Sequence, residues 1–482
     1  MSRFPLLLAG ALTLAMAGPA LAQSEAEQDP AVAACMGKTD PAAEARMSAC
    51  NELLRSDLDD ADRSYVLDLR AILHMEMELN DRALADATAA IRLTPAQGGA
   101  YYIRALVFSA MDDHKLALAD IERAVKLDPK DALSLALRGK LRAHNDDTAG
   151  AMADYSRAIE LEPDDVNHLL ERSWVREAMN DDAGALADLN QAVKLSNDAP
   201  DALVQKADFL LYKNRHDEAK AAYDQALAKQ ADFVLALTGR ARLHQEQGAL
   251  TEAKADLDRA ISLQPDRPNT LQTRAWLRHQ MDDQVGARGD MDRAVELAGD
   301  APALLERAAF FSRQGQFDLA MADIAHAEAK TPKSALASIA RAGVYADRKD
   351  WNRAIVEADR AVKLAPDDTT ALNAACWVRG QAGRELDRAV SICTKAIGLA
   401  PRDFAPLDSR AFAHLRRGDL TKALADAEAA LALYPTSAET LYLRGAVKLR
   451  MGQKAEGEAD LASARRIRPK VEAEYADYGL LL

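Results

Sequence analysis

Residues 131–163 read DALSLALRGKLRAHNDDTAGAMADYSRAIELEP, and this stretch contains the pattern that decides the fold. Apolar and small residues recur every three or four positions in both of its halves, which is the period of an amphipathic helix. The halves meet at Asp146, a residue type that tolerates the left-handed backbone at the end of a helix. Pro163 cannot continue the second helix. The stretch therefore predicts two helices joined by a tight turn.

The same unit recurs along the chain with a period of 34 residues. Successive closing prolines are 34, 34, 102, 67, 34, 35, 34 and 34 residues apart. Because 102 is three times 34 and 67 is 34 plus 33, three units close without a proline, at Asn197, Ala231 and Gly299. Twelve full units are predicted over residues 62–469. The closing prolines are Pro95, Pro129, Pro163, Pro265, Pro332, Pro366, Pro401, Pro435 and Pro469.

Alanine stands five residues before the closing position of every unit. The steric explanation is that the helix axes approach so closely that a larger side chain would overpack the crossing. These alanines are Ala90, Ala124, Ala158, Ala192, Ala226, Ala260, Ala294, Ala327, Ala361, Ala396, Ala430 and Ala464.

This arrangement resembles the tetratricopeptide repeat family, which has a 34-residue helix-turn-helix unit with small residues at the crossings and a final proline. The resemblance covers residues 62–469 and implies an all-α fold, an α-solenoid of twelve tandem repeats in a right-handed superhelix. It also implies a concave groove lined by the first helix of each repeat. The usual role of the family, binding a peptide or a folded partner in that groove, would follow.

The ends of the chain differ from the repeats. Arg3 precedes a short apolar run that ends in a small-x-small site, which predicts a secretory signal over residues 1–22, cut after Ala22, and a bacterial-type periplasmic location. An uncleaved membrane anchor is the alternative. We expect a disordered linker over residues 23–31, a partial N-terminal capping repeat over 32–61 and a C-terminal capping helix over 470–482.

The composition narrows the class of partner. With 61 basic and 75 acidic residues the net charge is −14, so the average field repels nucleic acid and anionic membranes. The hydrophobic fraction of 49% excludes a largely disordered chain. After the signal, no stretch reaches eighteen uninterrupted apolar residues, so the mature chain is not expected to span a membrane.

Ten units carry an arginine in the first helix and an acidic residue sixteen positions later in the second. The two exceptions, Lys206 with Ala222 and Ala375 with Ile392, lack both partners together, which predicts contact. We expect a ladder of ion pairs that fixes helix register, and the alternative is a basic stripe that reads an acidic ligand. The pairs are Arg70/Asp86, Arg104/Asp120, Arg138/Asp154, Arg172/Asp188, Arg240/Asp256, Arg274/Asp290, Arg307/Asp323, Arg341/Glu357, Arg410/Asp426 and Arg444/Asp460.

Four cysteines in an exported chain are an even number in a compartment that permits disulfides. In the resembled fold Cys376 and Cys393 face each other across a helix pair, so a disulfide is expected there. It would replace the missing ion pair of that unit. Cys35 and Cys50 look like the same device in the terminal unit. A redox-active pair is the alternative, although CxxC spacing is absent.

The sequence contains few candidate catalytic or metal-binding motifs. The nine histidines show no metal-ligand spacing, and no phosphate loop, nucleophile elbow or catalytic triad can be nominated. Aspartate pairs such as Asp112-Asp113 lack the alternating ligands of a calcium loop and are expected to cap the second helices. We therefore expect no enzyme activity, no metal and no cofactor.

Three tryptophans occupy one register position that faces the concave groove in the resembled family. They are candidate anchors for a partner, since aromatic side chains bury much area with few rotors. The alternative is that they fill gaps between first helices. The candidate partner-binding residues are Trp174, Trp276, Trp377, Tyr102, Tyr212, Arg313, Phe412, Arg416, Tyr442 and Arg450.

These features predict a non-enzymatic scaffold that binds an unidentified peptide or protein partner in a concave superhelical groove. The alternative is an accessory subunit of a glycan- or envelope-modifying enzyme, with saccharides stacked on the three tryptophans.

Overall fold

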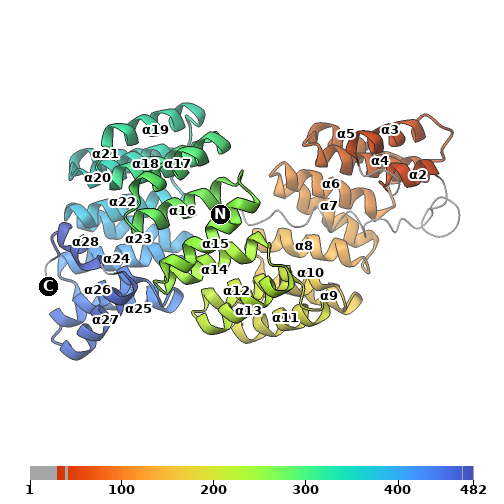
Figure 1. The fold of residues 1–482 in the computed structure, drawn as a ribbon. Helices are drawn as coiled ribbons and strands as arrows, with labels where there is room; N and C mark the ends of the chain where they lie inside the picture. The colour runs from red at the N-terminus through yellow and green to blue at the C-terminus, as the bar shows by residue number, and fades with distance from the viewer. Residues whose placement is uncertain (1–29, 38–41, 469, 481–482) are drawn as a thin grey trace. The chain divides into compact units, whose positions relative to one another are not determined.

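The computed structural model describes residues 30–37, 42–468 and 470–480. Every regular element in these residues is a helix, which confirms the predicted all-α class (Figure 1). The predicted signal peptide lies outside the described residues, as do residues 23–29 of the predicted linker. Helix α2 begins at Pro30, so the last two residues of that linker are helical and the prediction of disorder there was wrong.

The chain forms two compact units, Met1–Lys206 and Ala207–Leu482, and α12 continues from the first into the second. The helices of the first unit are α2 (Pro30–Cys35), α3 (Ala43–Leu53), α4 (Asp60–Glu76), α5 (Asn80–Leu93), α6 (Gly98–Ala110), α7 (His114–Leu127), α8 (Ala132–His144), α9 (Thr148–Leu161), α10 (Val166–Ala178), α11 (Asp182–Leu195) and the start of α12 (Pro200–Tyr212).

The second unit contains the rest of α12 and sixteen further helices. They are α13 (His216–Lys229), α14 (Val234–Glu246), α15 (Leu250–Leu263), α16 (Pro268–Gln280), α17 (Gln284–Ala298), α18 (Ala301–Arg313), α19 (Phe317–Lys330), α20 (Leu336–Asp347), α21 (Trp351–Leu364), α22 (Thr369–Ala382), α23 (Leu386–Leu399), α24 (Phe404–Arg417), α25 (Leu420–Leu433), α26 (Ala438–Arg450), α27 (Lys454–Ile467) and α28 (Val471–Asp477).

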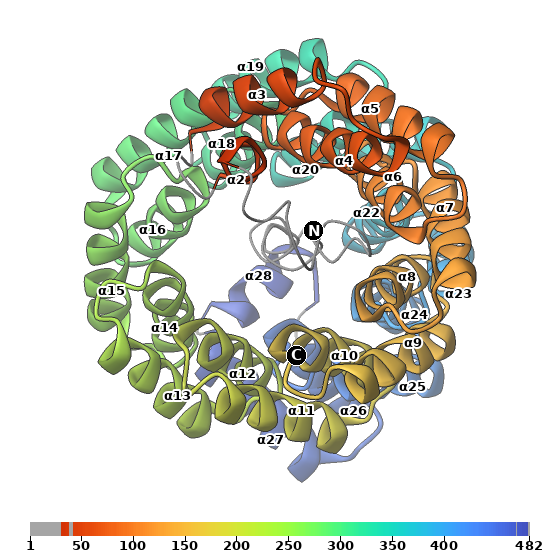
Figure 2. The same cartoon turned by 90° about the vertical axis from the view of Figure 1, so that its right-hand side faces the viewer.

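From α4 to α27 the helices alternate between two roles. The even-numbered ones are the first helices of their repeats and the odd-numbered ones are the second helices. From α4 to α11 and from α13 to α27 each helix packs against the next, as α6 does with α7 and α7 with α8. Within each unit the first helices form the inner layer of a curved wall and the second helices the outer layer (Figure 2). Each unit is thus an α-solenoid with a concave face made by first helices.

The turns inside the repeats have the geometry that the sequence predicts. Each predicted turn residue has a positive φ, for example 63° at Asp146. The next aspartate caps the second helix, as Asp147 does by accepting a hydrogen bond of 2.9 Å from the backbone of Gly150. The aspartate pairs therefore act as caps. The turn residues predicted to be left-handed are Asp112, Asp146, Asn180, Asn214, Gly248, Asp282, Gly315, Gly418 and Gly452, and the structure adds Glu78, Lys349, Gly383 and Glu385.

The alanines at the crossings are buried in all twelve repeats, none more than 1% exposed. Such burial leaves no room for a larger side chain, which confirms the steric reading of their recurrence. No helix in the described part of the chain is both long and apolar enough to cross a bilayer.

Candidate functional site

All ten predicted ion pairs form between the two helices of their repeats. Arg104 is typical: its Nε and Nη2 donate to the two carboxylate oxygens of Asp120 at 2.6 and 2.8 Å. These hydrogen bonds raise the pKa of Arg104. Because each guanidinium already has a carboxylate partner, the ladder is not a stripe of free arginines for an acidic ligand.

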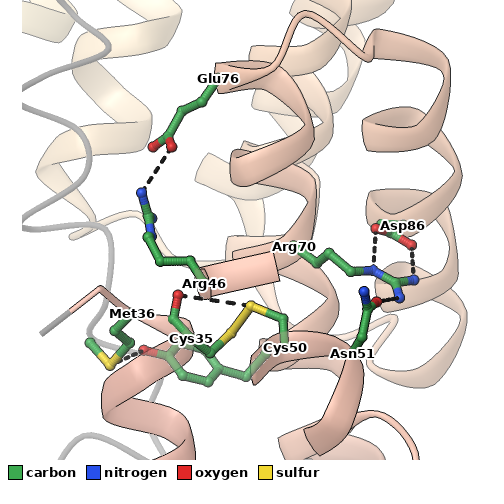
Figure 3. The surroundings of a disulfide bond; sticks show 9 residues. Cys35, Met36, Arg46, Cys50, Asn51, Arg70, Glu76 and Asp86 are labelled. Atoms are coloured by element: carbon green, nitrogen blue, oxygen red, sulfur yellow. Dashed lines mark hydrogen bonds and ion pairs between the residues drawn. A yellow bond between two sulfur atoms is a disulfide. The ribbon is translucent and has the colours of Figure 1, made fainter. Parts of the chain in front are cut away.

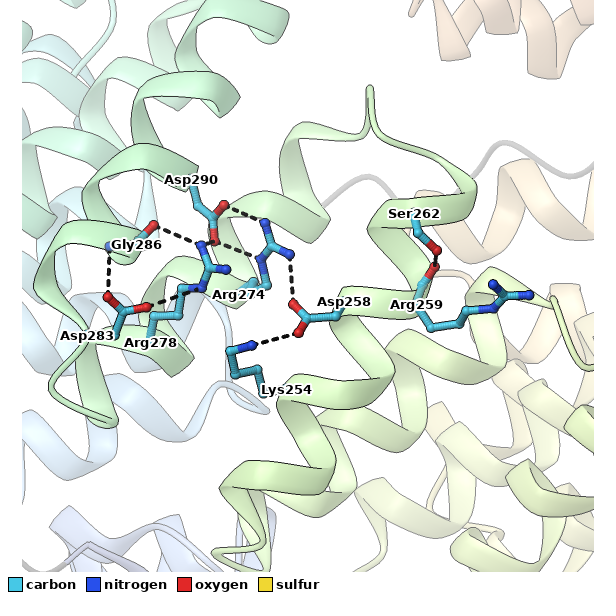
Figure 4. A network of polar contacts seen from close by, with 9 residues as sticks. All are labelled: Lys254, Asp258, Arg259, Ser262, Arg274, Arg278, Asp283, Gly286 and Asp290. Carbon is cyan, nitrogen blue, oxygen red and sulfur yellow. Dashed lines mark hydrogen bonds and ion pairs between the residues drawn. The ribbon is translucent and has the colours of Figure 1, made fainter.

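The ladder also joins neighbouring repeats, which the sequence interpretation missed. Arg274 bonds Asp290 in its own repeat and reaches back to Asp258 of the preceding one at 2.8 Å (Figure 4). Arg278, four residues further on, adds a second cation to Asp290 at 2.9 Å. The signal for this second cation is its spacing of four residues, one helical turn, from the first. The second cations at this position are Arg142, Arg176, Arg278 and Lys448. The histidines His74, His244 and His414 occupy the same position in other repeats and add charge only when protonated.

The cysteines pair as the sequence predicts. Cys35 joins Cys50 and Cys376 joins Cys393, with Cα atoms 4.8 and 5.7 Å apart, and all four are buried. Figure 3 shows the first disulfide beside the N-terminal ion pair of the ladder, where Arg70 bonds both Asn51 and Asp86. Disulfides form and persist in oxidising compartments, which is consistent with a non-cytoplasmic location.

The expectation that the second disulfide simply replaces an ion pair was incomplete. In that repeat Arg379, one turn after Ala375, is fully buried. It bonds Asp359 of the preceding repeat at 2.8 Å and Glu385 in the turn at 2.9 Å. The hydrogen bond from Arg379 lowers the pKa of Glu385. The ionic link has moved by one turn of helix, beside the covalent one.

The three register-matched tryptophans lie in different environments. Trp174 is 41% exposed. The ring of Trp276 packs edge-on against Phe310, lies under Arg313 at 5.0 Å, and its Nε1 donates to Glu306 at 2.6 Å. Trp377 is covered by other aromatic side chains, as described below. A row of three open anchors is therefore absent, and Trp174 is the exposed one.

The other candidate residues divide into covered and open side chains. Tyr102, Phe412 and Tyr442 are buried, so they act as packing residues in this structure. Tyr212 is 50% exposed, with the ammonium of Lys213 4.9 Å above its ring. Arg450 is exposed. The prediction from register alone could not distinguish these groups.

The C-terminal segment accounts for much of this covering. Helix α28 packs on α26 and α27 and lies on the concave side of the second unit (Figure 2). Tyr475 stacks on Tyr442 with ring centroids 4.9 Å apart, and it meets Phe412 edge-on at 5.5 Å. Trp377 lies edge-on to Tyr478 at 6.0 Å. The surface formed by Trp377, Phe412, Arg416 and Tyr442 is called the C-terminal groove below.

One cluster of possible cation ligands occurs among the described residues, in the turn between α9 and α10. Nε2 of the buried His168 lies 3.5 Å from Glu162 and 3.9 Å from Asp165. Asp165 also caps α10 by accepting a hydrogen bond from the backbone of Asn167. When His168 is protonated these contacts are ion pairs that fix the turn.

Comparison with known proteins supports the repeat assignment. Residues 69–132, 106–166 and 204–268 match the profile of the tetratricopeptide repeat family. Among curated proteins, none matches the chain in sequence.

Solved structures with a similar fold include yeast Tom70, with 16% identity, a TM-score of 0.43, and coverage of 88% of this chain and 96% of that one. The Cut9–Hcn1 assembly of the APC/C gives 15% identity, a TM-score of 0.36, and coverage of 91% and 94%. PilF of Pseudomonas aeruginosa gives 18%, 0.37, and coverage of 43% and 94%. At these values the likeness transfers no function.

Proposed function

Because this chain is a tetratricopeptide-repeat protein, we propose that it is a non-enzymatic scaffold that binds a segment of a protein partner on the concave faces of its repeats. The observation that supports this best is the occupied C-terminal groove. First helices α22, α24 and α26 together hold a short helical segment through aromatic side chains. A face that accommodates one such segment has the shape and chemistry to accommodate another.

Export to an oxidising compartment is part of the proposal. Both disulfides are buried within repeats, where they would form on folding in such a compartment and be at risk in a reducing one. The N-terminal signal in the sequence favours the same location. The partner would then be another exported or envelope protein.

The environments of the three tryptophans do not favour the alternative of a saccharide-tracking groove. It required a series of open tryptophan rings, whereas Trp276 contacts Phe310 edge-on and has Arg313 over its ring, and Trp377 contacts Tyr478 edge-on. Only the ring of Trp174 among these three is exposed enough to stack on a sugar. An interaction scaffold therefore fits the geometry better than a glycan groove.

The test is affinity capture of partners from an envelope extract with the chain as bait. A concave variant, Trp174→Ala with Tyr212→Ala, removes two exposed aromatic side chains from first helices. A matched convex control, Val285→Ala with Val356→Ala, removes two exposed apolar side chains from second helices. We expect wild type and the control to capture the same protein and the concave variant to lose most of it. Equal capture by both variants would remove the concave face as the binding site.

A further inference from the structure

The C-terminal segment contacts the last repeat and also the two repeats before it. A cap needs only to cover the apolar face of the last repeat, and Val471, which is fully buried, does this. The residues that follow turn back over side chains of earlier repeats. Tyr475 and Tyr478 contact Trp377 and Phe412, which belong to α22 and α24. The segment thus fills a groove made by three successive first helices.

The centre of the groove is an aromatic slot. Tyr475 is buried between the stacked ring of Tyr442 and the edges of Phe412 and Trp377. Tyr478, three residues later, covers the outer side of Trp377 and stays partly exposed. Aromatic contacts of this kind dominate the affinity of helix-in-groove recognition. Two aromatic residues three positions apart on one helix face are what this slot accepts.

The rim of the groove has both basic and acidic side chains: Arg416 and Lys349 contact the segment, and the carboxylates of Asp347 and Glu439 lie near its two tyrosines. Nη1 of Arg416 donates to the backbone carbonyl of Tyr478 at 2.5 Å, and Nζ of Lys349 lies 3.2 Å from the carboxylate of Asp477. Burial and the neighbouring Arg450 lower the pKa of Arg416. Among the described residues no carboxylate pairs with Arg416. Because Arg416 bonds only a neutral carbonyl, it favours a ligand that places a carboxylate beside it.

Docking of the segment buries a hydroxyl group that makes no hydrogen bond within the described residues. The hydroxyl oxygen of Tyr475 is buried without a hydrogen-bond partner among the described residues. The buried Asp408, which accepts a hydrogen bond of 2.6 Å from Thr440, contributes to the electrostatic surroundings of Tyr475. Each unpaired buried polar group weakens docking. The segment is also short, since α28 has seven residues.

We propose that residues 470–480 are a displaceable internal ligand of the C-terminal groove, and that its external ligand is a short helical segment of an acidic protein with two aromatic residues three positions apart. This inference rests on the proposed function. Tethering gives the internal segment an effective concentration on the order of millimolar, so it closes the groove against weak ligands. A partner with a better-matched aromatic pair and additional carboxylates displaces it.

The test uses a fluorescent synthetic peptide with the sequence of residues 470–480, KVEAEYADYGL, as probe. The protein is the full mature chain, as wild type and as a latch variant with Tyr475→Ala and Tyr478→Ala. The latch variant keeps every groove residue but loses the aromatic pair of the tethered copy. We expect fluorescence anisotropy to show at least about tenfold tighter binding of the probe to the latch variant, because the tethered competitor is removed.

Three further changes, two in the protein and one in the probe, test whether the probe binds in the C-terminal groove. Arg416→Gln in the latch variant should weaken the probe about tenfold, since it removes a charged hydrogen-bond donor to the peptide carbonyl. Val356→Ala, on a convex face, should leave binding unchanged. A probe with both tyrosines replaced by alanine should not bind.

Two results would overturn the inference. One is a latch variant that unfolds cooperatively, as the wild type does, yet binds the probe no better. The other is a latch variant whose last repeats lose cooperative unfolding, because α28 is then a structural cap. If the probe fails while the chain still captures a partner through the face around Trp174, only this inference falls. If capture fails too, the proposed function falls with it.

Discussion

The ion-pair ladder predicts that two equivalent arginines in adjacent repeats contribute unequally to stability. Arg104 and Arg138 hold Asp120 and Asp154 through the same pair of hydrogen bonds. One turn further along the first helix the repeats differ. Arg142 gives Asp154 a second cation at 2.8 Å, whereas Phe108 stands at the equivalent position beside Asp120.

The magnitudes follow from what each substitution leaves behind. Arg104→Ala leaves Asp120, which is 8% exposed, without a cation, and orphaning a buried carboxylate costs about 3–5 kcal/mol. Protonating it at pH 7 instead costs about 4 kcal/mol, three pKa units. Arg138→Ala leaves Asp154 paired with Arg142, so only about 1–2 kcal/mol of hydrogen bonding and packing is lost. The difference is about 2 kcal/mol.

Native-state hydrogen exchange is the suitable assay, because long repeat arrays unfold by parts and a single midpoint mixes their stabilities. Amides of α6 and α7 report on Arg104→Ala, and those of α8 and α9 on Arg138→Ala. Asp120→Asn in the Arg104→Ala background should restore part of the loss, since it removes the orphaned charge. Equal losses for the two arginines, or a larger loss for Arg138→Ala, would refute this account of the ladder.

Three further predictions concern the second unit. Replacing Cys376 and Cys393 by serine should cost about 3 kcal/mol, because the disulfide closes a loop with a sequence separation of 17, and a shift below about 1 kcal/mol in denaturant unfolding would contradict this. Burial raises the pKa of Asp408 to about 7, so stability should fall as the pH rises from about 4 to 7 and then level off. Asp408→Asn should flatten that slope in thermal melts between pH 4 and pH 8, and an unchanged slope would exclude Asp408 as its source. Gly239→Ala should destabilise by about 1–3 kcal/mol because its Cβ would lie 2.4 Å from Tyr223, whereas Gly343→Ala, with no atom within 4 Å, should gain up to about 1 kcal/mol; equal melting shifts would refute the clash.

The features that could be read from the sequence are those that recur. The position of Ala158 repeats in twelve units, and the left-handed turn at Asp146 has counterparts in most of them. The pairing of Arg104 with Asp120 was inferable because both partners vanish together in two repeats. Each of these is a local contact at fixed sequence separation, so the chain supplies many independent copies of the same evidence.

The contacts that could not be read occur once. Tyr475 lies 98 residues after Trp377, and nothing periodic connects them. The ionic link through Arg379 is also confined to its repeat. Asp359 stands at the register of Asp258, but its arginine comes one helical turn later than the ladder arginine, and Glu385 lies in the turn. A repeat pattern sets where each helix lies, but it does not state which side chain from outside the pattern covers a given position.

The three tryptophans show how far the position of a residue within its repeat predicts whether its side chain is exposed. The ring of Trp276 packs on Phe310, 34 residues later, and that of Trp377 on Phe412, 35 residues later, so each rests on the residue at its own register position one repeat on. The residue 34 positions after Trp174 is Asp208, which offers no ring. Among the three tryptophans, the ring is therefore covered where the next repeat supplies a second ring, and it is open where the next repeat does not. By this rule the sequence predicts that the ring of Trp174 is exposed. The ring of Trp377 packs against Phe412 and is further covered by the C-terminal segment. On the proposed function, the partner would bind where aromatic neighbours are missing or where the internal segment is displaced.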